Sequence, residues 1–193
     1  ATGLTLNFWN ANGLASNSTS GGGDGTWSTT APVWTDSNGN VTLAMQPQPG
    51  FTIFGGTPGT VTVDNSATAV SATGLQFASD GYTLTGDTLT LISAGSMPIL
   101  RVGDGSSTGA NSTATISAVI AGTDGLNKTD LGTLILTGAN TYTGGTTISA
   151  GTLQGDTTSL RGDIIDNATL VFNQTTDGSF VGTVSGAGSL GKL

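Results

Sequence analysis

The sequence predicts an all-β protein folded as a parallel β-helix. Three observations support this prediction. Glycine accounts for 32 of the 193 residues, whereas Glu is absent and Lys and Arg together number 4, so long solvent-exposed helices lack their usual residues. Short runs of Val, Ile and Leu alternate with Thr, Ser and Asn, as in strands that bury one face. Similar turn-and-strand segments then recur along the chain, which is typical of a solenoid.

Composition and charge disfavour several classes of protein. Hydrophobic residues make up 35% of the chain, enough to bury a core, so we expect folded rather than disordered structure. A net charge of -8 disfavours binding to nucleic acid and to anionic membrane surfaces, because both interactions require Lys and Arg. No apolar run approaches the ~18 residues of a membrane-spanning helix, so we expect no direct membrane insertion of this segment.

Two zones of different composition divide the chain into a cap and a run of coils. Residues 1–50 hold all three Trp (Trp9, Trp27 and Trp34), and residues 51–193 repeat short apolar runs between turns. The open end of a solenoid must be covered, so we expect the first zone to form an N-terminal cap with the first coils, and the second to form the parallel β-helix. The Trp side chains are expected to pack in this cap rather than form a platform for carbohydrate.

Ten segments have the length and alternation of strands. In each of them, residues two positions apart share a face, and the outward positions hold mostly Thr, Ser and Asn. These uncharged side chains can stack on like residues in neighbouring strands without charge repulsion. The predicted strands are residues 60–63, 82–85, 88–92, 99–102, 114–120, 133–136, 146–149, 152–154, 168–172 and 179–184.

Imperfect internal similarity favours stacked coils. One coil cannot bury its inner face alone, whereas a stack makes the core continuous and leaves a polar outer wall. A β-sandwich uses similar strands and is the main alternative. Asn-Gly hairpin signals occur only at Asn12-Gly13 and Asn38-Gly39, and their scarcity favours the β-helix. The similar pairs are GDTLTLI (86–92) with LGTLILT (131–137), GTDGLNK (122–128) with GAGSLGK (186–192), and GTL at 132–134 and 151–153.

One stretch resembles a known family. Residues 131–154 read LGTLILTGANTYTGGTTISAGTLQ, which is similar at nearly every position to the passenger-associated transport repeat of bacterial autotransporters, proteins exported by the type V route. The resemblance covers residues 125–154 and extends more weakly to both sides. The segment GLQFASDGYTLTGDTLTLI, which starts at Gly74, is similar to the region that often precedes this repeat, and the Trp-rich beginning is similar to the start of a mature passenger.

The resemblance implies a right-handed, single-stranded parallel β-helix that is exported across the outer membrane and displayed at the bacterial cell surface or secreted. It also implies an outer-membrane barrel in the same parent chain. That barrel is absent from this sequence, so we expect the chain to be a passenger fragment. Within the repeat we expect Leu134, Leu136, Ile148 and Leu153 to face inward, Thr and Asn to face outward, and Gly to occupy the corners. The periodicity leaves open whether Tyr142 points in or out.

Little in the sequence supports catalysis or metal binding. Without His and Cys, neither a Ser-His-Asp triad nor a Cys-His pair can form. Asp163 and Asp166 are the closest acidic pair in the repeat region, but no other residue marks the sugar cleft of a glycan-cleaving enzyme. GGGDG at residues 21–25 and VGDGSS at 102–107 resemble half of a calcium-binding repeat and lack the tandem copy that such sites need. We therefore expect no enzyme activity, no metal and no cofactor.

Arg161-Gly162-Asp163 is the candidate cell-attachment site. This tripeptide can present a guanidinium and a carboxylate from one exposed turn, a geometry that integrins recognise, and some autotransporter adhesins resemble this chain in carrying it. The alternative is a simple turn between Leu160 and Ile164, because such triplets arise easily in a sequence rich in Gly and Asp. Only the first interpretation requires cell attachment that depends on Asp163.

The sequence thus predicts an autotransporter passenger fragment that acts as an adhesin or self-association module in cell adhesion, aggregation, biofilm formation or host contact. Rows of Thr, Asn and Ser offer many weak hydrogen bonds, which suits multivalent contact. The expected partners are a second copy of the chain, or a protein or glycan of the host cell surface or matrix. Two alternatives stay open. One is a non-binding stalk and folding scaffold for a domain elsewhere in the parent chain, and the other is a polysaccharide-active β-helix enzyme.

Overall fold

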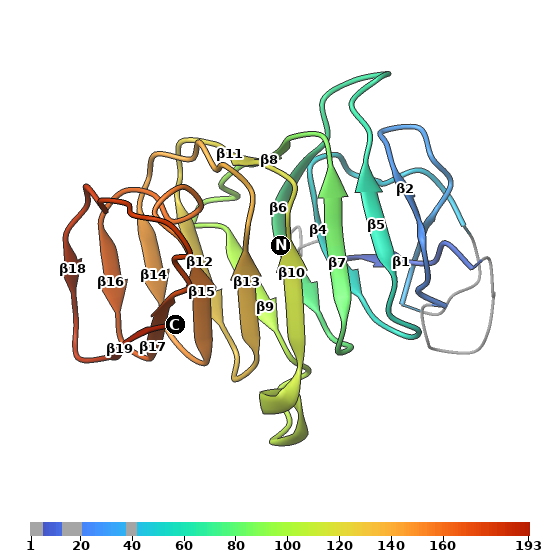
Figure 1. Ribbon diagram of the computed structural model, residues 1–193. Helices are drawn as coiled ribbons and strands as arrows, with labels where there is room; N and C mark the ends of the chain where they lie inside the picture. The colour runs from blue at the N-terminus through green and yellow to red at the C-terminus, as the bar shows by residue number, and fades with distance from the viewer. Residues whose placement is uncertain (1–5, 13–20, 38–41) are drawn as a thin grey trace.

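The chain winds into successive coils, and the coils place their short strands in two facing sheets (Figure 1). The computed structural model describes residues 6–12, 21–37 and 42–193. Coils stack from the N-terminal end to the C-terminal end, so each strand pairs with the strands of the coils before and after it. The two sheets enclose the core between them.

One sheet contains eight strands in the part of the chain that the structure describes, and we call it the eight-stranded sheet. Its strands follow one another in sequence order, one from each coil. From the N-terminal end they are β2 (Gly25–Trp27), β5 (Thr60–Val63), β7 (Tyr82–Gly86), β10 (Thr113–Ile116), β13 (Thr133–Leu136), β15 (Thr152–Gly155), β17 (Thr169–Phe172) and β19 (Ser189–Lys192).

The opposite sheet has eleven strands among the described residues, and we call it the eleven-stranded sheet. Two of its strands, β8 (Leu89–Leu91) and β11 (Ile120–Ala121), pair with each other at the side. A short 3-10 helix, Thr108–Asn111, lies in the loop that leads into β10. The other strands are β3 (Trp34–Thr35), β1 (Leu6–Trp9), β4 (Gly50–Phe54), β6 (Ser71–Phe77), β9 (Ile99–Val102), β12 (Leu126–Thr129), β14 (Thr146–Ile148), β16 (Ile164–Asp166) and β18 (Val184–Ser185).

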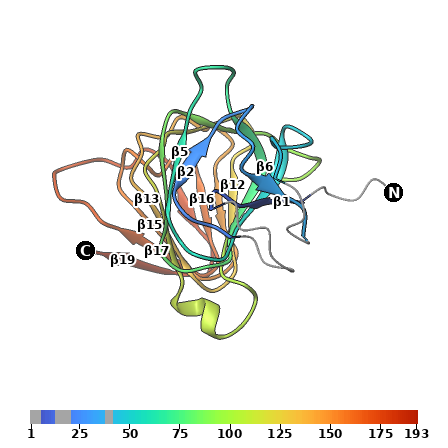
Figure 2. The ribbon, with the colours of Figure 1, turned by 90° about the vertical axis from the view of Figure 1, so that its right-hand side faces the viewer.

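Parallel pairing confirms the predicted parallel β-helix. Figure 2 shows β5, β13, β15 and β17 on one side of the stack and β6, β12 and β16 on the other. Among the named strands that the structure describes, every pairing is parallel except that of β1 with β3. A β-sandwich is built from antiparallel sheets, so the alternative fold is wrong. No helix in the described ranges is long and apolar enough to cross a membrane.

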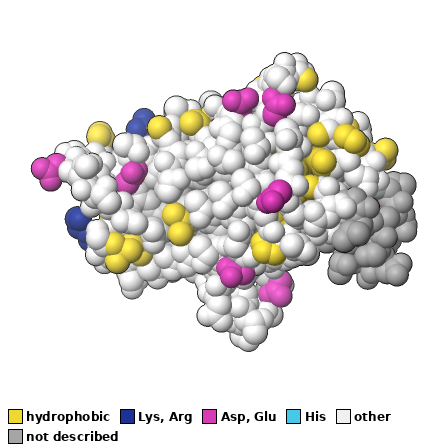
Figure 3. Space-filling model, turned by 45° about the vertical axis from the view of Figure 1, so that its right-hand side comes forward, with side chains coloured by type: hydrophobic (Ala, Val, Ile, Leu, Met, Phe, Trp, Pro, Cys, Tyr) yellow, Lys and Arg dark blue, Asp and Glu magenta, His cyan; other side chains and the backbone are white. Residues whose placement is uncertain are grey.

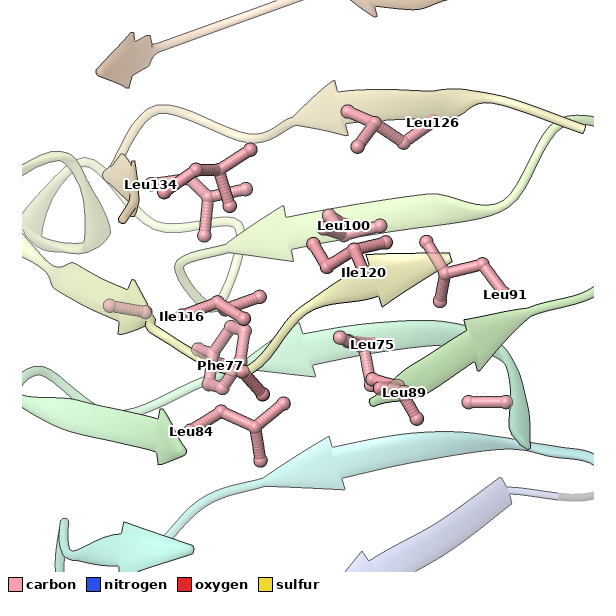
Figure 4. Close-up of a cluster of buried hydrophobic side chains, with 14 of the residues drawn as sticks. Leu75, Phe77, Leu84, Leu89, Leu91, Leu100, Ile116, Ile120, Leu126 and Leu134 are labelled. Atoms are coloured by element: carbon pink, nitrogen blue, oxygen red, sulfur yellow. The ribbon is translucent and has the colours of Figure 1, made fainter. Parts of the chain in front are cut away.

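Stacked side chains fill the inside of the coils, as the alternation predicts. Leu134, Leu136, Ile148 and Leu153 are all buried, which confirms their predicted inward direction. Leu134 stacks on Leu153 of the next coil in register. Figure 4 shows part of this core, where Leu100, Ile116, Leu126 and Leu134 project from their strands into the space between the sheets. Burial of such side chains is the main favourable term in folding.

Several polar residues of the repeat also point inward, among them Tyr142, Asn140 and Thr146. Tyr142 is 2% exposed, so its ring fills the coil. Thr146 is 2% exposed and Asn140 is 3% exposed, so the prediction that the Thr and Asn residues of the repeat face outward is wrong for these two. The side-chain amide of Asn140 forms hydrogen bonds with backbone groups inside the stack, so the burial of Asn140 leaves no polar group unpaired.

Aromatic side chains fill the N-terminal end of the core. Trp34 lies 5.1 Å from both Trp9 and Trp27 between ring centroids, in edge-to-face contacts. Phe54 contacts all three Trp and stacks on Phe77. All three Trp are buried, which confirms the predicted packing role over a carbohydrate platform. Since β1 pairs with β4 in one sheet, the division into a cap of residues 1–50 and coils of residues 51–193 stays a prediction.

The strand predictions succeed mainly on the eight-stranded sheet. Predicted residues 60–63, 99–102 and 133–136 coincide with β5, β9 and β13. Five further predictions differ from a strand by one or two residues, and residues 114–120 divide into β10 and β11. The prediction for residues 179–184 is wrong except at its last residue, which begins β18. The missed strands are β1, β2, β3, β4, β6, β12, β16 and β19.

Only some of the similar sequence segments occupy equivalent positions in successive coils. GTL at residues 132–134 and 151–153 does mark equivalent positions, because β13 and β15 pair in that register. The alignment of Leu89 with Leu134 is wrong, because Leu89 lies in β8, whereas the partner of Leu134 in the preceding coil is Ala114. Lys128 and Lys192 likewise lie in different sheets. Coils of unequal length break the sequence period while the strands stay stacked.

Candidate contact sites

Arg161, Gly162 and Asp163 lie between β15 and β16, and all three are exposed. The backbone here is held by neighbouring coils. The N–H of Thr146 donates to the carbonyl of Asp163 at 2.9 Å, and the N–H of Thr183 donates to its carboxylate at 2.8 Å. Gly162 has a φ of 66°, which glycine adopts without strain. The tripeptide therefore forms a corner of the solenoid wall whose side chains face solvent.

A groove of about 480 Å³ runs beside this corner. It is lined by the tripeptide itself and by residues of the two adjacent coils, including Thr143, Phe180 and Val181. Val181 is 97% exposed, so part of the groove wall is apolar and open to solvent. Arg161 forms no ion pair within the described ranges, which leaves its guanidinium available to a ligand. One carboxylate oxygen of Asp163 is already bound to the Thr183 amide.

The structure separates the acidic pair that could act as acid and base. Asp163 is exposed, whereas Asp166 lies in β16 with its side chain buried, 3% exposed. The carboxylate of Asp166 accepts a hydrogen bond from the N–H of Ala168 at 3.0 Å. The two carboxylates therefore face different environments, one in solvent and one inside the coil. A glycosidase places its two carboxyl groups on either side of one bond of the bound sugar, so both must be accessible to the sugar, whereas Asp166 is buried.

The calcium-like turns use their carboxylates as structural hydrogen-bond acceptors. Asp24 accepts from the N–H of Thr60 in the next coil at 2.6 Å. Asp104 accepts from both the N–H and the hydroxyl of Ser106, and these bonds lower the pKa of its carboxyl group. No group of three or more His, Cys, Asp or Glu side chains that could hold a metal ion occurs within the described ranges.

A mostly polar surface, which we call the polar wall, covers the outer face of the eight-stranded sheet, where Ile135 and Val171 are the apolar outward residues of β13 and β17. Successive rungs place hydroxyl residues directly above one another, about 4.8 Å apart. The outward positions from β2 to β19 include no charged residue. Figure 3 shows one face of the molecule on which uncharged polar surface predominates and most carboxylates lie towards its borders. The longest column is Thr113, Thr133, Thr152, Thr169 and Ser189.

The outer face of the eleven-stranded sheet carries an apolar groove that sequence reasoning missed. Its volume is about 580 Å³. Phe51 lies over Gly74, where an added Cβ would come within 2.7 Å of its ring. The signal was available in β4, where Phe51 and Ile53 share the outward face and Phe54 lies on the inward face. The lining residues are Leu6, Phe51, Ile53, Gln76, Ile99, Arg101, Thr129 and Asp130.

An ion pair forms part of the wall of this apolar groove. The Arg101 Nε donates to the Asp130 carboxylate at 2.8 Å, and the N–H of Gly105 donates to the same oxygen at 2.9 Å. Burial raises the pKa of Asp130, but the hydrogen bonds from Arg101, Leu131 and Gly105 outweigh it, so the net pKa is lowered. The carboxylate therefore stays ionised beside the guanidinium.

Lys128 is fully buried inside the repeat. The residue pattern did not predict this, because Lys is rarely buried. Its ammonium donates to three backbone carbonyls, those of Thr129 at 3.0 Å, Asp130 at 2.9 Å and Ala150 at 3.0 Å. Desolvation lowers the pKa of Lys128 to about 8, and the charge of Asp130 opposes this shift. The three N–H groups of the ammonium match the three acceptors, so the buried charge is compensated.

Comparison with known proteins supports the family resemblance. The family model described as Passenger-associated-transport-repeat matches residues 126–154, within the predicted span of 125–154. Over 156 residues, which are 80% of this chain, the sequence is 46% identical to the protein named "Adhesin BmaC autotransporter" from Brucella suis biovar 1 (strain 1330). The aligned part is 4% of the length of that relative. No solved structure matches the chain.

Proposed function

We propose that this chain, which is a segment of an autotransporter passenger domain, acts as an adhesin at the bacterial cell surface or after release from it. The name of the 46% identical relative supports an adhesive role. The proposed partners are a second copy of the chain, or a protein or glycan of the host surface or matrix. An outer-membrane barrel of the same parent chain would anchor it. No catalytic step is assigned, since the chain has no His or Cys and Asp163 and Asp166 do not share one environment.

The observation that carries this proposal is the polar wall of the eight-stranded sheet. Each Thr contributes a weak hydrogen-bonding group, and the stack repeats that group on every rung. Many weak contacts made together can exceed the affinity of any one of them by several orders of magnitude. The absence of charge on these outward positions also reduces the repulsion between two acidic molecules that meet face to face. Self-association and host binding would both use this surface.

A pair of charges placed on this wall tests the proposal. Thr133→Asp with Thr152→Asp puts carboxylates on adjacent rungs, and we expect cell aggregation or host attachment to fall by about tenfold or more. The measurement is aggregation and matrix binding of cells that express the full parent protein, with surface display checked by labelling.

The matched control carries the same charges on the opposite sheet. Asn127→Asp with Thr147→Asp also places two carboxylates on adjacent rungs, and we expect adhesion to be retained. Equal adhesion by both displayed variants and the wild type would contradict a role for the polar wall. Equal loss by both variants would show that added charge acts without regard to the surface.

We further propose that Arg161, Gly162 and Asp163 contribute a cell-attachment site. Their exposure beside an open groove supports this use. Asp163→Glu moves the carboxylate by one methylene, and we expect attachment of integrin-bearing cells to be abolished. Asp177→Glu, the same change at an exposed Asp outside the groove, is the control. Unchanged attachment in Asp163→Glu would overturn the site.

A folding scaffold is the second candidate function for residues 126–154, and the match to the transport repeat favours it. Deletion of residues 125–154 separates the candidates in cells that express the full parent protein. Loss of surface display would assign a scaffold role to this stretch. Normal display with lost adhesion would assign a binding role.

A further inference from the structure

The buried polar side chains of residues 126–154, which lie in a mostly apolar interior, include Lys128, Asn140 and Tyr142. Each of these three forms a hydrogen bond to the coil that follows. Lys128 reaches the carbonyl of Ala150, Asn140 reaches that of Ser159, and Tyr142 reaches the N–H of Arg161. These bonds join positions that are 22, 19 and 19 residues apart in sequence. The Lys128 bond thus joins two coils within the repeat, and the other two bonds link the repeat to Ser159 and Arg161 beyond it.

Asn140 bridges three coils with one amide group. Its side-chain oxygen accepts from the N–H of Ile120 in the preceding coil at 2.8 Å. Its side-chain nitrogen donates to the carbonyl of Ser159 in the following coil at 2.7 Å. Ser159 is itself buried. A shift of either coil along the stack direction or along its strands would break one of these bonds, and a buried polar group would lose its partner.

Tyr142 connects the repeat to the exposed corner. Its hydroxyl lies 2.9 Å from the hydroxyl of Thr146 and accepts from the N–H of Arg161 at 3.2 Å. Thr146 in turn donates its N–H to the carbonyl of Asp163 at 2.9 Å. The backbone at both ends of the tripeptide is therefore tied, directly or through one residue, to a single buried phenol.

We propose that the repeat sets the register of the following coil through Lys128, Asn140 and Tyr142, and that Tyr142 is the positioning residue for the Arg161-Gly162-Asp163 corner. The use of that corner in attachment rests on the proposed function, whereas the register role does not. Columns of Leu and Ile tolerate small shifts, because apolar contact is not directional. Buried polar networks favour one arrangement, since every alternative leaves a donor or acceptor unpaired. Lys128, Asn140 and Tyr142 therefore favour a single register of the coils, which the columns of Leu and Ile do not.

Hydrogen–deuterium exchange of the 193-residue chain tests the proposal. Tyr142→Phe keeps the ring in the core and removes the acceptor of the Arg161 amide. We expect exchange in residues 156–163 to become about tenfold faster, the result of losing one net hydrogen bond. Tyr82→Phe is the matched control, because it removes the hydroxyl of another buried Tyr, bound to the carbonyl of Gly55 at 2.6 Å in a distant coil. In this control, the exchange rates of residues 156–163 should be the same as in the wild type.

A selective effect of Tyr142→Phe supports the proposal, and an effect in residues 156–163 no larger than that of Tyr82→Phe overturns it. Asn140→Leu gives a second measurement with a two-sided pattern. It should accelerate exchange both at β11 and at residues 156–163, because the amide bonds to both coils are lost. Acceleration on neither side would also overturn the register role.

Cell attachment measured on the same variants separates this proposal from the attachment site. If Asp163→Glu leaves attachment unchanged, the attachment site fails while the exchange result still decides the register role. If Tyr142→Phe accelerates exchange and Asp163→Glu abolishes attachment, Tyr142→Phe should lower attachment partially, because the recognised side chains remain and only their backbone is loosened.

Discussion

Lys128 occupies an inward position whose partners on the neighbouring rungs are Leu100 and Ile148. A charge in such a column is costly unless hydrogen bonds replace its hydration. The chain turns three carbonyls inward at adjacent corners, and one of them belongs to Asp130, whose φ of 63° is unusual for a residue other than Gly. The strained backbone at Asp130 thus coincides with a carbonyl that accepts a hydrogen bond from the Lys128 ammonium.

This arrangement predicts a stability that depends on pH. The pKa of Lys128 is about 8 in the folded chain and 10.5 in the unfolded reference, so the unfolded chain binds more protons between these values. The free energy of unfolding should therefore rise with pH over this window, by up to about 3 kcal/mol from this group. Lys128→Met lacks the titrating group and leaves three carbonyls unpaired. The free energy of unfolding of the wild type should therefore increase relative to that of Lys128→Met as the pH rises from 8 to 10.5.

Denaturant unfolding at several pH values measures this difference. The control is Lys192→Met, which removes an exposed Lys from β19 and should change the free energy of unfolding by less than about 0.5 kcal/mol at every pH. A constant difference between the wild type and Lys128→Met across the window would contradict the prediction.

At the scale of the strand and its corners, neighbouring coils approach so closely that some corners admit only Gly. Gly151, between β14 and β15, has a φ of 69° and lies against the carbonyls of Asp130 and Gly132. Gly95 also has a positive φ, 100°, but has open space around it. The two glycines share a conformation that disfavours other residues, and only one also lacks room for a Cβ.

Replacement of each of these glycines by Ala separates the two effects. Gly95→Ala should lower the free energy of unfolding by about 1–2 kcal/mol, the cost of a positive φ for a residue with a Cβ. Gly151→Ala should cost at least about 2 kcal/mol more, because the added Cβ would clash with two carbonyls and separate the coils. Chemical denaturation of both variants gives the comparison. Equal costs would mean that the corner at Gly151 relaxes freely.

Across the whole molecule, the character of the core changes along the stack. The N-terminal end is aromatic, with Phe54 in contact with Trp9, Trp27 and Trp34, whereas the middle is built from Leu and Ile. The last strands, β18 and β19, are mostly exposed. A solenoid is stabilised by contacts between neighbouring repeats, so the two ends should respond differently to truncation.

Removal of residues 1–50 should uncover the aromatic core. Phe54 would lose its contacts with all three Trp. A large aromatic side chain buries about 150–250 Å², so part of an area of this size would become exposed for each ring that is uncovered. We expect strong binding of a hydrophobic dye and a lower Tm in the shortened chain. Removal of residues 184–193 is the control and should change both values little, because that end is already exposed. Similar dye binding by both truncated chains would contradict a capping role for residues 1–50.

Prediction from sequence works best where the alternation is intact. β5, β9 and β13 were placed at their observed bounds because each alternates simply or is a short apolar run between turns. β12 and β16 were missed because Lys128 and Asp166 occupy their inward positions and hide the apolar period. β6 was missed because Gly74 interrupts it on its outer face.

The candidate site divides in the same way. Arg161, Gly162 and Asp163 were found from the tripeptide itself, a local signal. Tyr142 and Asn140 could not be assigned their contacts, because those contacts join residues 19 or more positions apart. The apolar groove was missed for a related reason, since it combines residues from β1, β4, β6, β9 and β12 on one face.

The sequence by itself determined the fold class, the polar outer wall and the transport repeat, because composition and a period of two residues are local properties that each strand expresses alone. The tertiary structure decided which polar residues turn inward and what they hold. Lys128, Asn140 and Tyr142 are stable inside because the stacked coils bring carbonyl and amide partners to them from distant parts of the chain, in addition to partners close in sequence. Burial of a polar side chain depends on its partners, and stacking supplies them.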